Sequence, residues 1–200
     1  MTTAQSPLDH LKQGIADSLA VKTLLANDEA TLRHIVEVGE LMIQAFRRGN
    51  RVLFAGNGGS AADAQHLAAE FVSRFEFDRP GLPSIALSTD TSMLTAIGND
   101  YGYEKLFRRQ LEAQARPGDV FVGITTSGRS KNILAAFAAC RQLQVTSVAL
   151  CGQGGELAGV DHVLRAPSSH TPRIQECHIL IGHMLCAQVE LDIFGHLAPQ

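Results

Sequence analysis

Four side chains on two predicted helices are of the types needed for acid–base or metal chemistry. His66 and Glu70 are four residues apart, so on one helix they lie on the same face. Gln175 and His183 are eight residues apart, which is about two helical turns, and they point in similar directions. Two imidazoles, a carboxylate and an amide oxygen can form a divalent-metal site or an acid–base site. The spacing leaves open which of the two it is and whether the two helices meet.

Two short loops rich in glycine and hydroxyl side chains each connect a predicted strand to a predicted helix. Residues 56–60 read Gly-Asn-Gly-Gly-Ser, and residues 125–130 read Thr-Thr-Ser-Gly-Arg-Ser. Glycine lets a ligand approach the backbone, and the free N–H groups of a helix start attract an anion. The candidate ligand contacts are Asn57, Gly58, Gly59, Ser60, Thr125, Thr126, Ser127 and Ser130. Because the full dinucleotide pattern and the P-loop Gly-Lys-Ser/Thr are both missing, we predict a small phosphate monoester as the ligand.

The other histidines and the cysteines fit structural roles. His178 shares a predicted helix with His183, and its role stays undecided. Five further histidines are interpreted as ordinary core or surface residues: His10, His34, His162, His170 and His196. The four cysteines lack the C-x-x-C spacing of a metal or redox motif: Cys140, Cys151, Cys177 and Cys186. We therefore expect reduced core thiols and a cytoplasmic protein.

The elements that must position these residues alternate between strand and helix after residue 50. Strands are predicted at 51–55, 84–87, 120–124, 145–150 and 162–165, and helices at 61–75, 103–115, 132–143 and 173–194. This alternation favours an α/β fold, with a five-stranded parallel sheet covered by helices on both faces. Ligands of such sheets bind at the carboxyl ends of the strands, where both loops are expected to lie.

Two more helices are predicted ahead of the sheet. The first carries apolar residues at helical spacing, and the second begins after Asn27 or Asp28 and ends at residues 49–50. We expect residues 1–50 to form a helical pair used in oligomer packing, 51–195 the sheet domain and 196–200 a tail. The last helix, 173–194, is apolar on nearly every side. This favours an oligomer that covers it, and the alternative is a central core helix.

Composition limits the class of protein. The 200 residues carry 17 Lys and Arg against 20 Asp and Glu, a formal net charge of -3, with 45% hydrophobic and 18% charged residues. A chain with this balance has no basic stripe for nucleic acid, and its length suits a single domain. We find no apolar run near the roughly 20 residues of a membrane span, and expect no signal peptide at the N-terminus. So few charges on an apolar chain also favour an oligomer.

Combined, these motifs resemble those of a known enzyme family. The residues that carry the resemblance are residues 56–60 with Asp63, His66 and Glu70, then Gly98-Asn99-Asp100, residues 125–130, and Arg173-Ile-Gln-Glu-x-His178 with His183. They resemble the phosphoheptose isomerase branch of the SIS (sugar isomerase) domain family, over about residues 8–194. The combination is far more specific than the two loops alone.

The resemblance implies a fold, an activity and a set of site residues. The fold is a three-layer α-β-α sandwich with a flavodoxin-like sheet, in a homotetramer with active sites at subunit interfaces. The reaction converts D-sedoheptulose 7-phosphate to D-glycero-D-manno-heptose 7-phosphate, the first step toward the ADP-heptose of lipopolysaccharide. The family's zinc ligands fall on His66, Glu70, Gln175 and His183. Its substrate contacts fall on Asn57, Gly58, Gly59, Asn99, Asp100, Thr125, Thr126, Ser127, Ser130 and Gln175, and we add Ser60 and Glu70.

The chemistry assigns roles to two of these residues. Aldose–ketose isomerisation moves a proton between two carbons through an enediol, so it requires a carbon base and a group that exchanges protons with the oxygens. The resemblance suggests Glu70 as the carbon base and His183 as the oxygen-side acid–base, with zinc as Lewis acid or as an ordering ion. Arg129 replaces the asparagine common in the family, and it either touches the phosphate or faces solvent.

Two other functions are compatible with the loops. One is a non-catalytic SIS-domain adaptor that binds the replication initiator DnaA; intact Glu70 and His183 favour the enzyme over it. The other is a different phosphosugar isomerase or a sugar-binding regulator, against which the leading helices and the segment around Gln175 argue.

Overall fold

The structure is a computed structural model that describes residues 6–199. Residues 1–5, which begin the predicted helical pair and the segment expected to lack a signal peptide, lie outside the described residues. Residue 200, the end of the predicted tail, also lies outside them. Of that tail, the described part contains a 3₁₀ turn, η2 (Gly195–Leu197).

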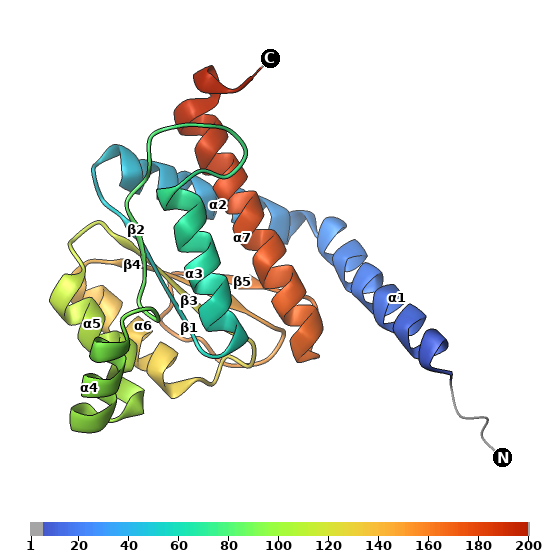
Figure 1. Ribbon diagram of the computed structural model, residues 1–200, viewed down its shortest axis with the longest axis horizontal. Coiled ribbons are helices and arrows are strands. Elements are labelled where there is room, and N and C mark those ends of the chain that lie inside the picture. Colours follow the sequence, from blue (N-terminus) through green and yellow to red (C-terminus); the bar gives the residue numbers. More distant parts are fainter. Residues whose placement is uncertain (1–5, 200) are drawn as a thin grey trace.

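The predicted helical pair precedes the sheet. Helix α1 (Pro7–Ala26) is capped by the Ser6 hydroxyl, and α2 (Glu29–Arg47) by the Asp28 carboxylate, which accepts from the Thr31 N–H at 3.0 Å. Both are favoured N-cap residues, which fixes where each helix begins. Helix α1 projects away from the body of the molecule, while α2 lies against it (Figure 1).

Five parallel strands form the central sheet, as predicted. They are β1 (Val52–Gly56), β2 (Ser84–Ala86), β3 (Val120–Thr125), β4 (Thr146–Cys151) and β5 (His162–Arg165). The predicted bounds are correct to within one residue at each end. The strand order is β2-β1-β3-β4-β5, the flavodoxin-like arrangement. The chain changes direction across the sheet at β1, so the loops after β1 and β3 lie side by side at its carboxyl edge.

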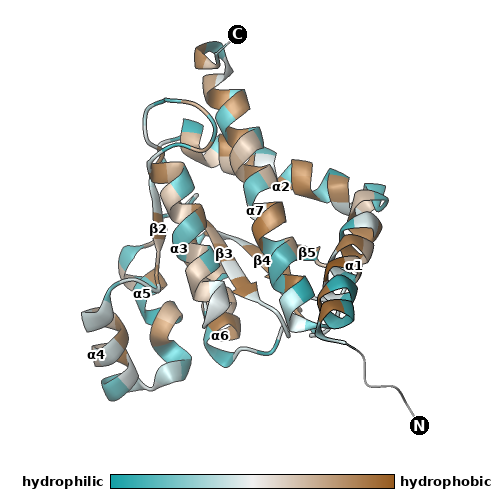
Figure 2. Ribbon diagram, turned by 45° about the vertical axis from the view of Figure 1, so that its right-hand side comes forward, coloured by the Kyte–Doolittle hydropathy of each residue, from teal (hydrophilic) through white to brown (hydrophobic). Residues whose placement is uncertain are grey.

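Helices cover both faces of the sheet and complete three layers. The helices after α2 are α3 (Gly59–Val72), α4 (Thr91–Tyr101), α5 (Leu106–Gln114), α6 (Lys131–Leu143) and α7 (Thr171–Phe194), with a 3₁₀ turn η1 (Tyr103–Lys105) before α5. One apolar cluster joins α2, α3 and α7 to one face, and a second joins α4, α5 and α6 to the other. Figure 2 shows hydrophobic residues in the central strands and along parts of the helices around them.

Helix α4 is missing from the sequence prediction, which placed a single helix at 103–115. None of the residues of α4 is buried, so its sequence lacks a strong apolar stripe facing the core. Gly98 and Asn99 lower its helix propensity further. The Asp90 carboxylate caps it by accepting from the Met93 N–H at 2.8 Å. The family motif at residues 98–100 therefore lies on a helix.

Helix α7 is a core helix along one side, as in the alternative expectation, and cover of its other side by an oligomer stays a prediction. Ile181, Leu185 and Val189 are at most 2% exposed within the single chain, between α2 and α3. By length and composition alone, the helical segment Thr171–Leu197 is long and apolar enough to cross a membrane. The expectation that no segment approaches a membrane span is therefore wrong. Its buried Glu190 pairs with Arg79 at 2.9 Å, as expected for a helix inside a folded domain.

Candidate active site

The first loop forms a helix start that is open to an anion. Gly58, the residue before α3, has φ of +56° and ψ of -122°, a conformation that glycine adopts without strain. No side chain caps α3, and the N–H groups of Ser60, Ala61 and Ala62 bond to the carbonyls of Asn57 and Gly58, which leaves the N–H of Gly59 to a ligand. Asn57 is half-buried, Gly58 and Gly59 are exposed, and Ser60 is buried at 4% exposure.

The second loop lies beside the first because β1 and β3 are paired neighbours, with Gly56 opposite Ile124. The hydroxyls of Thr125 and Ser130 are 3.0 Å apart, and the Ser127 hydroxyl accepts from the Arg129 N–H at 3.2 Å. Helix α6 begins directly after Ser130, again without a side-chain cap. Thr126 is half-buried, and Ser127 and Arg129 are exposed. Two uncapped helix starts and several hydroxyls therefore meet at one edge of the sheet.

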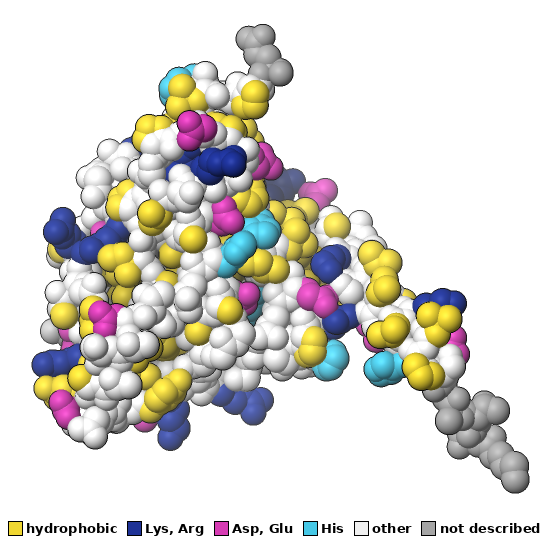
Figure 3. All heavy atoms as spheres, viewed as in Figure 1, with side chains coloured by type: hydrophobic (Ala, Val, Ile, Leu, Met, Phe, Trp, Pro, Cys, Tyr) yellow, Lys and Arg dark blue, Asp and Glu magenta, His cyan; other side chains and the backbone are white. Residues whose placement is uncertain are grey.

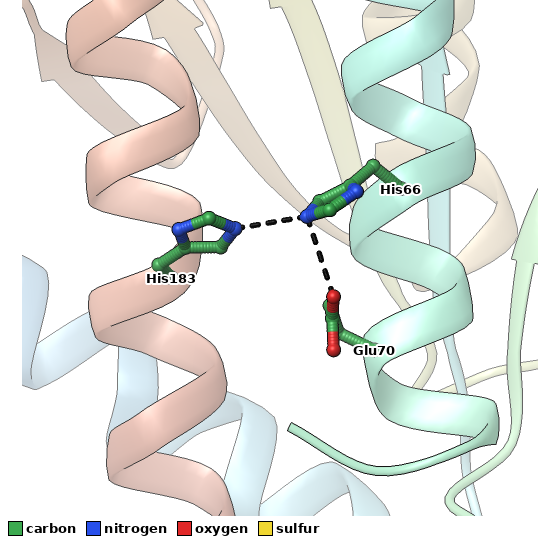
Figure 4. A group of neighbouring side chains, drawn as sticks. All are labelled: His66, Glu70 and His183. Carbon is green, nitrogen blue, oxygen red and sulfur yellow. Dashed lines mark hydrogen bonds and ion pairs between the residues drawn. The ribbon is translucent and has the colours of Figure 1, made fainter. Parts of the chain in front are cut away.

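Helices α3 and α7 run in the same direction and bring three predicted residues together. Nε2 of His66 lies 2.9 Å from Nε2 of His183 and 3.3 Å from Oε1 of Glu70 (Figure 4). Close packing of the two helices makes this possible, because a Cβ on Gly182 would collide with Leu67. The ring of Phe75 packs on His183, with centroids 5.3 Å apart. The two helices therefore meet, which the residue spacing alone left open.

This cluster offers the donor atoms of a metal site. One ligand atom from each of His66, Glu70 and His183 lies within 4.8 Å of the others. Two imidazole nitrogens and a carboxylate oxygen suit Zn²⁺, which uses three protein ligands in catalytic sites and leaves one position open. Among residues 6–199 no other histidine, cysteine or carboxylate group of three is so arranged. The side chain of His66 is 49% exposed, so a ligand can reach the cluster.

Gln175 lies at a different level of the two helices. A Cβ on Gly59 would collide with Nε2 of Gln175, which places this amide against the start of α3. His66 is seven residues further along α3, about 10 Å at the helical rise. In this conformation the predicted convergence of Gln175 and His183 does not occur within one chain. Gln175 lies at the start of α3, whereas the cluster is formed by His66, Glu70 and His183, and Gln175 as a fourth metal ligand stays a prediction.

Asn99 and Asp100 lie on the exposed surface of α4, where the Asn99 amide donates to the Asp100 carboxylate at 2.8 Å. The segment they belong to reaches the first loop through Tyr103, whose hydroxyl donates to Oδ1 of Asn57 at 3.0 Å. A pocket of about 350 Å³ lies between that loop and α4, with Asn57, Tyr103 and Leu94 among its walls.

A buried ion pair between Arg79 and Glu190 holds the segments next to the cluster in place. The Glu190 carboxylate accepts from the N–H groups of Phe75 and Glu76 and from Arg79, and Arg79 donates to the carbonyl of Glu70 at 2.8 Å. Burial raises the pKa of Glu190, but these hydrogen bonds and the Arg79 charge outweigh it and hold the pKa below its ordinary value. The ion pair thereby fixes both the end of α3 and the segment that carries Phe75.

Several residues near the site were not predicted from the sequence. Asn132, on the first turn of α6, bonds to Asn57; its position directly after the second loop was an available signal. Asp63 lies one turn before His66, and burial raises the pKa of its carboxyl while the charge of His66 opposes the rise. Phe75 follows α3 and had no signal in the sequence, because only the folded loop brings it to His183.

The remaining histidines lie outside the cluster. His178 is fully buried, and neither ring nitrogen has a hydrogen-bond partner among the described residues. Burial lowers its pKa to about 4, which the nearby backbone of Cys151 opposes only in part. His178 is therefore a neutral core residue at neutral pH. His34 and His162 pair at 3.1 Å between α2 and β5, while His10, His170 and His196 are exposed.

Comparisons with known proteins identify relatives of this chain. The sequence pattern of the SIS domain family matches residues 19–152. The chain is 56% identical over 188 residues to Phosphoheptose isomerase 2 of Campylobacter jejuni, covering 93% of this chain and 94% of the relative. It is also 56% identical to the phosphoheptose isomerase of Aneurinibacillus thermoaerophilus, covering 93% and 95%. The solved structure of a phosphoheptose isomerase from Neisseria gonorrhoeae superposes with a TM-score of 0.86 at 39% identity, over 92% of this chain and 99% of that one.

Proposed function

The chain belongs to the phosphoheptose isomerases of the SIS domain family, and from this membership we propose that it interconverts D-sedoheptulose 7-phosphate and D-glycero-D-manno-heptose 7-phosphate. The observation that carries the proposal is that His66, Glu70 and His183 converge beside α3, the helix that begins at the first of the two loops. We place the reaction as the first step toward the ADP-heptose of lipopolysaccharide. The adaptor alternative has no support, since the relatives compared above are phosphoheptose isomerases.

The arrangement along α3 suits an extended seven-carbon sugar phosphate. The uncapped starts of α3 and α6, with the hydroxyls of Thr125, Ser127 and Ser130, receive the phosphate dianion without a basic patch. About 10 Å further along α3, the cluster then faces the two carbons that exchange a proton. Gln175 contacts the substrate near Gly59, and Asn99 and Asp100 contact it from α4.

Proton transfer is divided between a carboxylate and an imidazole. Oε1 of Glu70 faces His66, which leaves the second carboxylate oxygen to take the proton from C1 of the ketose and return it to C2. His183 exchanges protons with the oxygens on C1 and C2, so that the enediol forms and collapses without free oxyanion charge. Phe75 and the packing of α7 on α3 hold the imidazole in place.

His66, Glu70 and His183 would hold a zinc ion, and the donor set fits this metal. When bound, zinc supplies Lewis-acid polarisation of the substrate oxygens. Glu70 and His183 would then each be both a ligand and a proton-transfer group, through different atoms: the two carboxylate oxygens of Glu70 and the two ring nitrogens of His183. In this scheme His66 serves only as a ligand.

A homotetramer with active sites at subunit interfaces completes the proposal. Five large apolar side chains of α1 are between 58% and 65% exposed: Leu8, Leu11, Ile15, Leu19 and Leu24. Figure 3 shows apolar side chains along the projecting helix. A neighbouring subunit that covers this face would bury it. We assign residues 1–50 to this packing, and the four free, buried cysteines support a cytoplasmic location.

Turnover and metal dependence test the function together. Purified protein is incubated with sedoheptulose 7-phosphate and aldose formation is followed, then repeated after chelation and after zinc is returned. We expect turnover in the metal-replete sample, loss on chelation and recovery with zinc. Glu70→Gln and His183→Ala should each lower kcat by at least about 1000-fold with an unchanged oligomer, since each removes one proton-transfer group. Absence of aldose product from the metal-replete wild type would falsify the proposal, and near-wild-type turnover in either variant removes that residue from the mechanism.

A further inference from the structure

The two substrate loops are joined by a pair of reciprocal side-chain hydrogen bonds. Nδ2 of Asn57 donates to Oδ1 of Asn132 at 2.9 Å, and Nδ2 of Asn132 donates to Oδ1 of Asn57 at 2.8 Å. Asn57 belongs to the first loop, and Asn132 lies on the first turn of the helix after the second loop. Asn132 is only 3% exposed, so water competes little for these bonds.

A backbone group fixes the orientation of both amides. The N–H of Ile133 donates to Oδ1 of Asn132 at 3.0 Å, and because a backbone N–H can only donate, that side-chain atom must be the oxygen. The nitrogen of Asn132 then faces Asn57, which must turn its own oxygen toward it. The backbone of α6 therefore sets the orientation of the Asn57 amide in the first loop.

Tyr103 occupies the last acceptor position of Asn57. Its hydroxyl donates to Oδ1 at 3.0 Å, so that oxygen already accepts two hydrogen bonds. One N–H of the Asn57 amide bonds Asn132, and the other is left for a ligand. Asn57 thus presents only a donor to the substrate, which suits a phosphate or sugar oxygen.

We propose that Asn132 and Tyr103 are positioning residues for the isomerisation, which act through Asn57 and hold the two loops and the α4–η1 segment in one fixed frame. This inference rests on the function proposed above. Without Asn132 the Asn57 amide is free to rotate and present its oxygen to the substrate anion. Without the Tyr103 hydroxyl, one constraint on the same amide is lost. The proton-transfer groups on α3 and α7 are not part of this frame, so substrate binding should suffer more than the chemical step.

A double-mutant cycle on the intact enzyme tests this assignment. KM and kcat for sedoheptulose 7-phosphate are measured for Tyr103→Phe, Asn132→Ala, Asn57→Ala and the two double variants that contain Asn57→Ala. We expect KM to rise about 5-fold in Tyr103→Phe and about 10-fold or more in Asn132→Ala, with smaller changes in kcat. In the Asn57→Ala background neither substitution should raise KM further. Tyr101→Phe is the matched control, because the Tyr101 hydroxyl contacts Arg109 and not the loop.

The outcomes separate positioning from a purely structural role. Effects on KM that add fully in the Asn57→Ala background overturn the proposal, as does a fall in kcat and in melting temperature at unchanged KM. If Asn132→Ala does not fold, the Tyr103→Phe cycle decides alone, since that side chain is 65% exposed and loses one hydroxyl. A wild type that neither turns over nor binds sedoheptulose 7-phosphate refutes the proposed function and this inference with it. An active wild type with an additive cycle refutes only the inference.

Discussion

At the scale of single residues, His66, Glu70 and His183 form the cluster that we propose as the reactive group. His66 and Glu70 were predicted as a pair because the i, i+4 spacing fixes a shared helix face. Gln175 was paired with His183 from direction alone, and the two turns between them separate the side chains along the axis. Asn132 escaped prediction because its role depends on the pairing of β1 with β3. Local spacing is readable, whereas contacts between distant segments require the fold.

His178 gives a prediction at this scale. Its pKa of about 4 lies below the ordinary value of 6.5, so the unfolded chain binds the proton first as pH falls. The contribution of neutral His178 to the free energy of unfolding is therefore fully present above pH 6.5 and is lost as pH falls toward 4. The expected loss between pH 7 and pH 5 is about 2 kcal/mol. Unfolding in urea at these two pH values and fixed protein concentration measures it. His178→Leu should flatten this difference, and an equal pH dependence in both proteins contradicts the assignment.

At the scale of elements, apolar periodicity predicted those that face the core. The pattern predicts the strands and helices α3, α5, α6 and α7, in which buried residues repeat, but it does not predict α4, which buries none. The register between helices was not readable, although the cluster depends on it. Gly182 lets α7 approach Leu67 on α3, directly beside His183 and His66.

Gly182→Ala should therefore move the two histidines apart. The added methyl collides with Leu67, so the helices separate or the core strains, at a cost of about 1–3 kcal/mol. We expect kcat to fall between about 10-fold and 100-fold, since misplacement of reacting groups by about 1 Å has this effect. Gly195→Ala is the control, because at the end of α7 a Cβ meets no atom within 4 Å. Steady-state kinetics that show equal kcat in both variants would contradict the role given to this packing.

At the scale of the whole molecule, two of the helices that favour an oligomer, α1 and α7, differ in how far the single chain covers them. One side of α7 is buried inside the chain by α2 and α3, so this side needs no partner, while Leu191 near its end is 53% exposed. Near its end α1 packs on the core through Leu25 and Val21, but its face with Leu8, Leu11, Ile15, Leu19 and Leu24 is not covered by the described residues. The largest uncovered apolar face among the described helices is therefore that of α1.

Charges on the α1 face should dissociate the assembly. Leu11→Glu combined with Ile15→Glu places two carboxylates on side chains that are 65% and 64% exposed in the single chain. We expect a smaller particle than the wild type in light scattering coupled to size exclusion, because burial of these charges at an interface is costly. Lys12→Glu, on the neighbouring side of α1, changes the net charge by the same amount and should leave the mass unchanged. A double variant with wild-type mass contradicts the interface.

The most direct test of the central claim is the isomerisation of sedoheptulose 7-phosphate in D₂O, followed by NMR. We predict that the zinc-replete enzyme forms the aldose with deuterium at C2, since an enediol returns its proton from a group that exchanges with solvent. Glu70→Gln, with the same fold and mass, should give neither product nor label. An unlabelled and unchanged ketose after incubation with the wild type, or labelling by Glu70→Gln at the wild-type rate, would contradict the account.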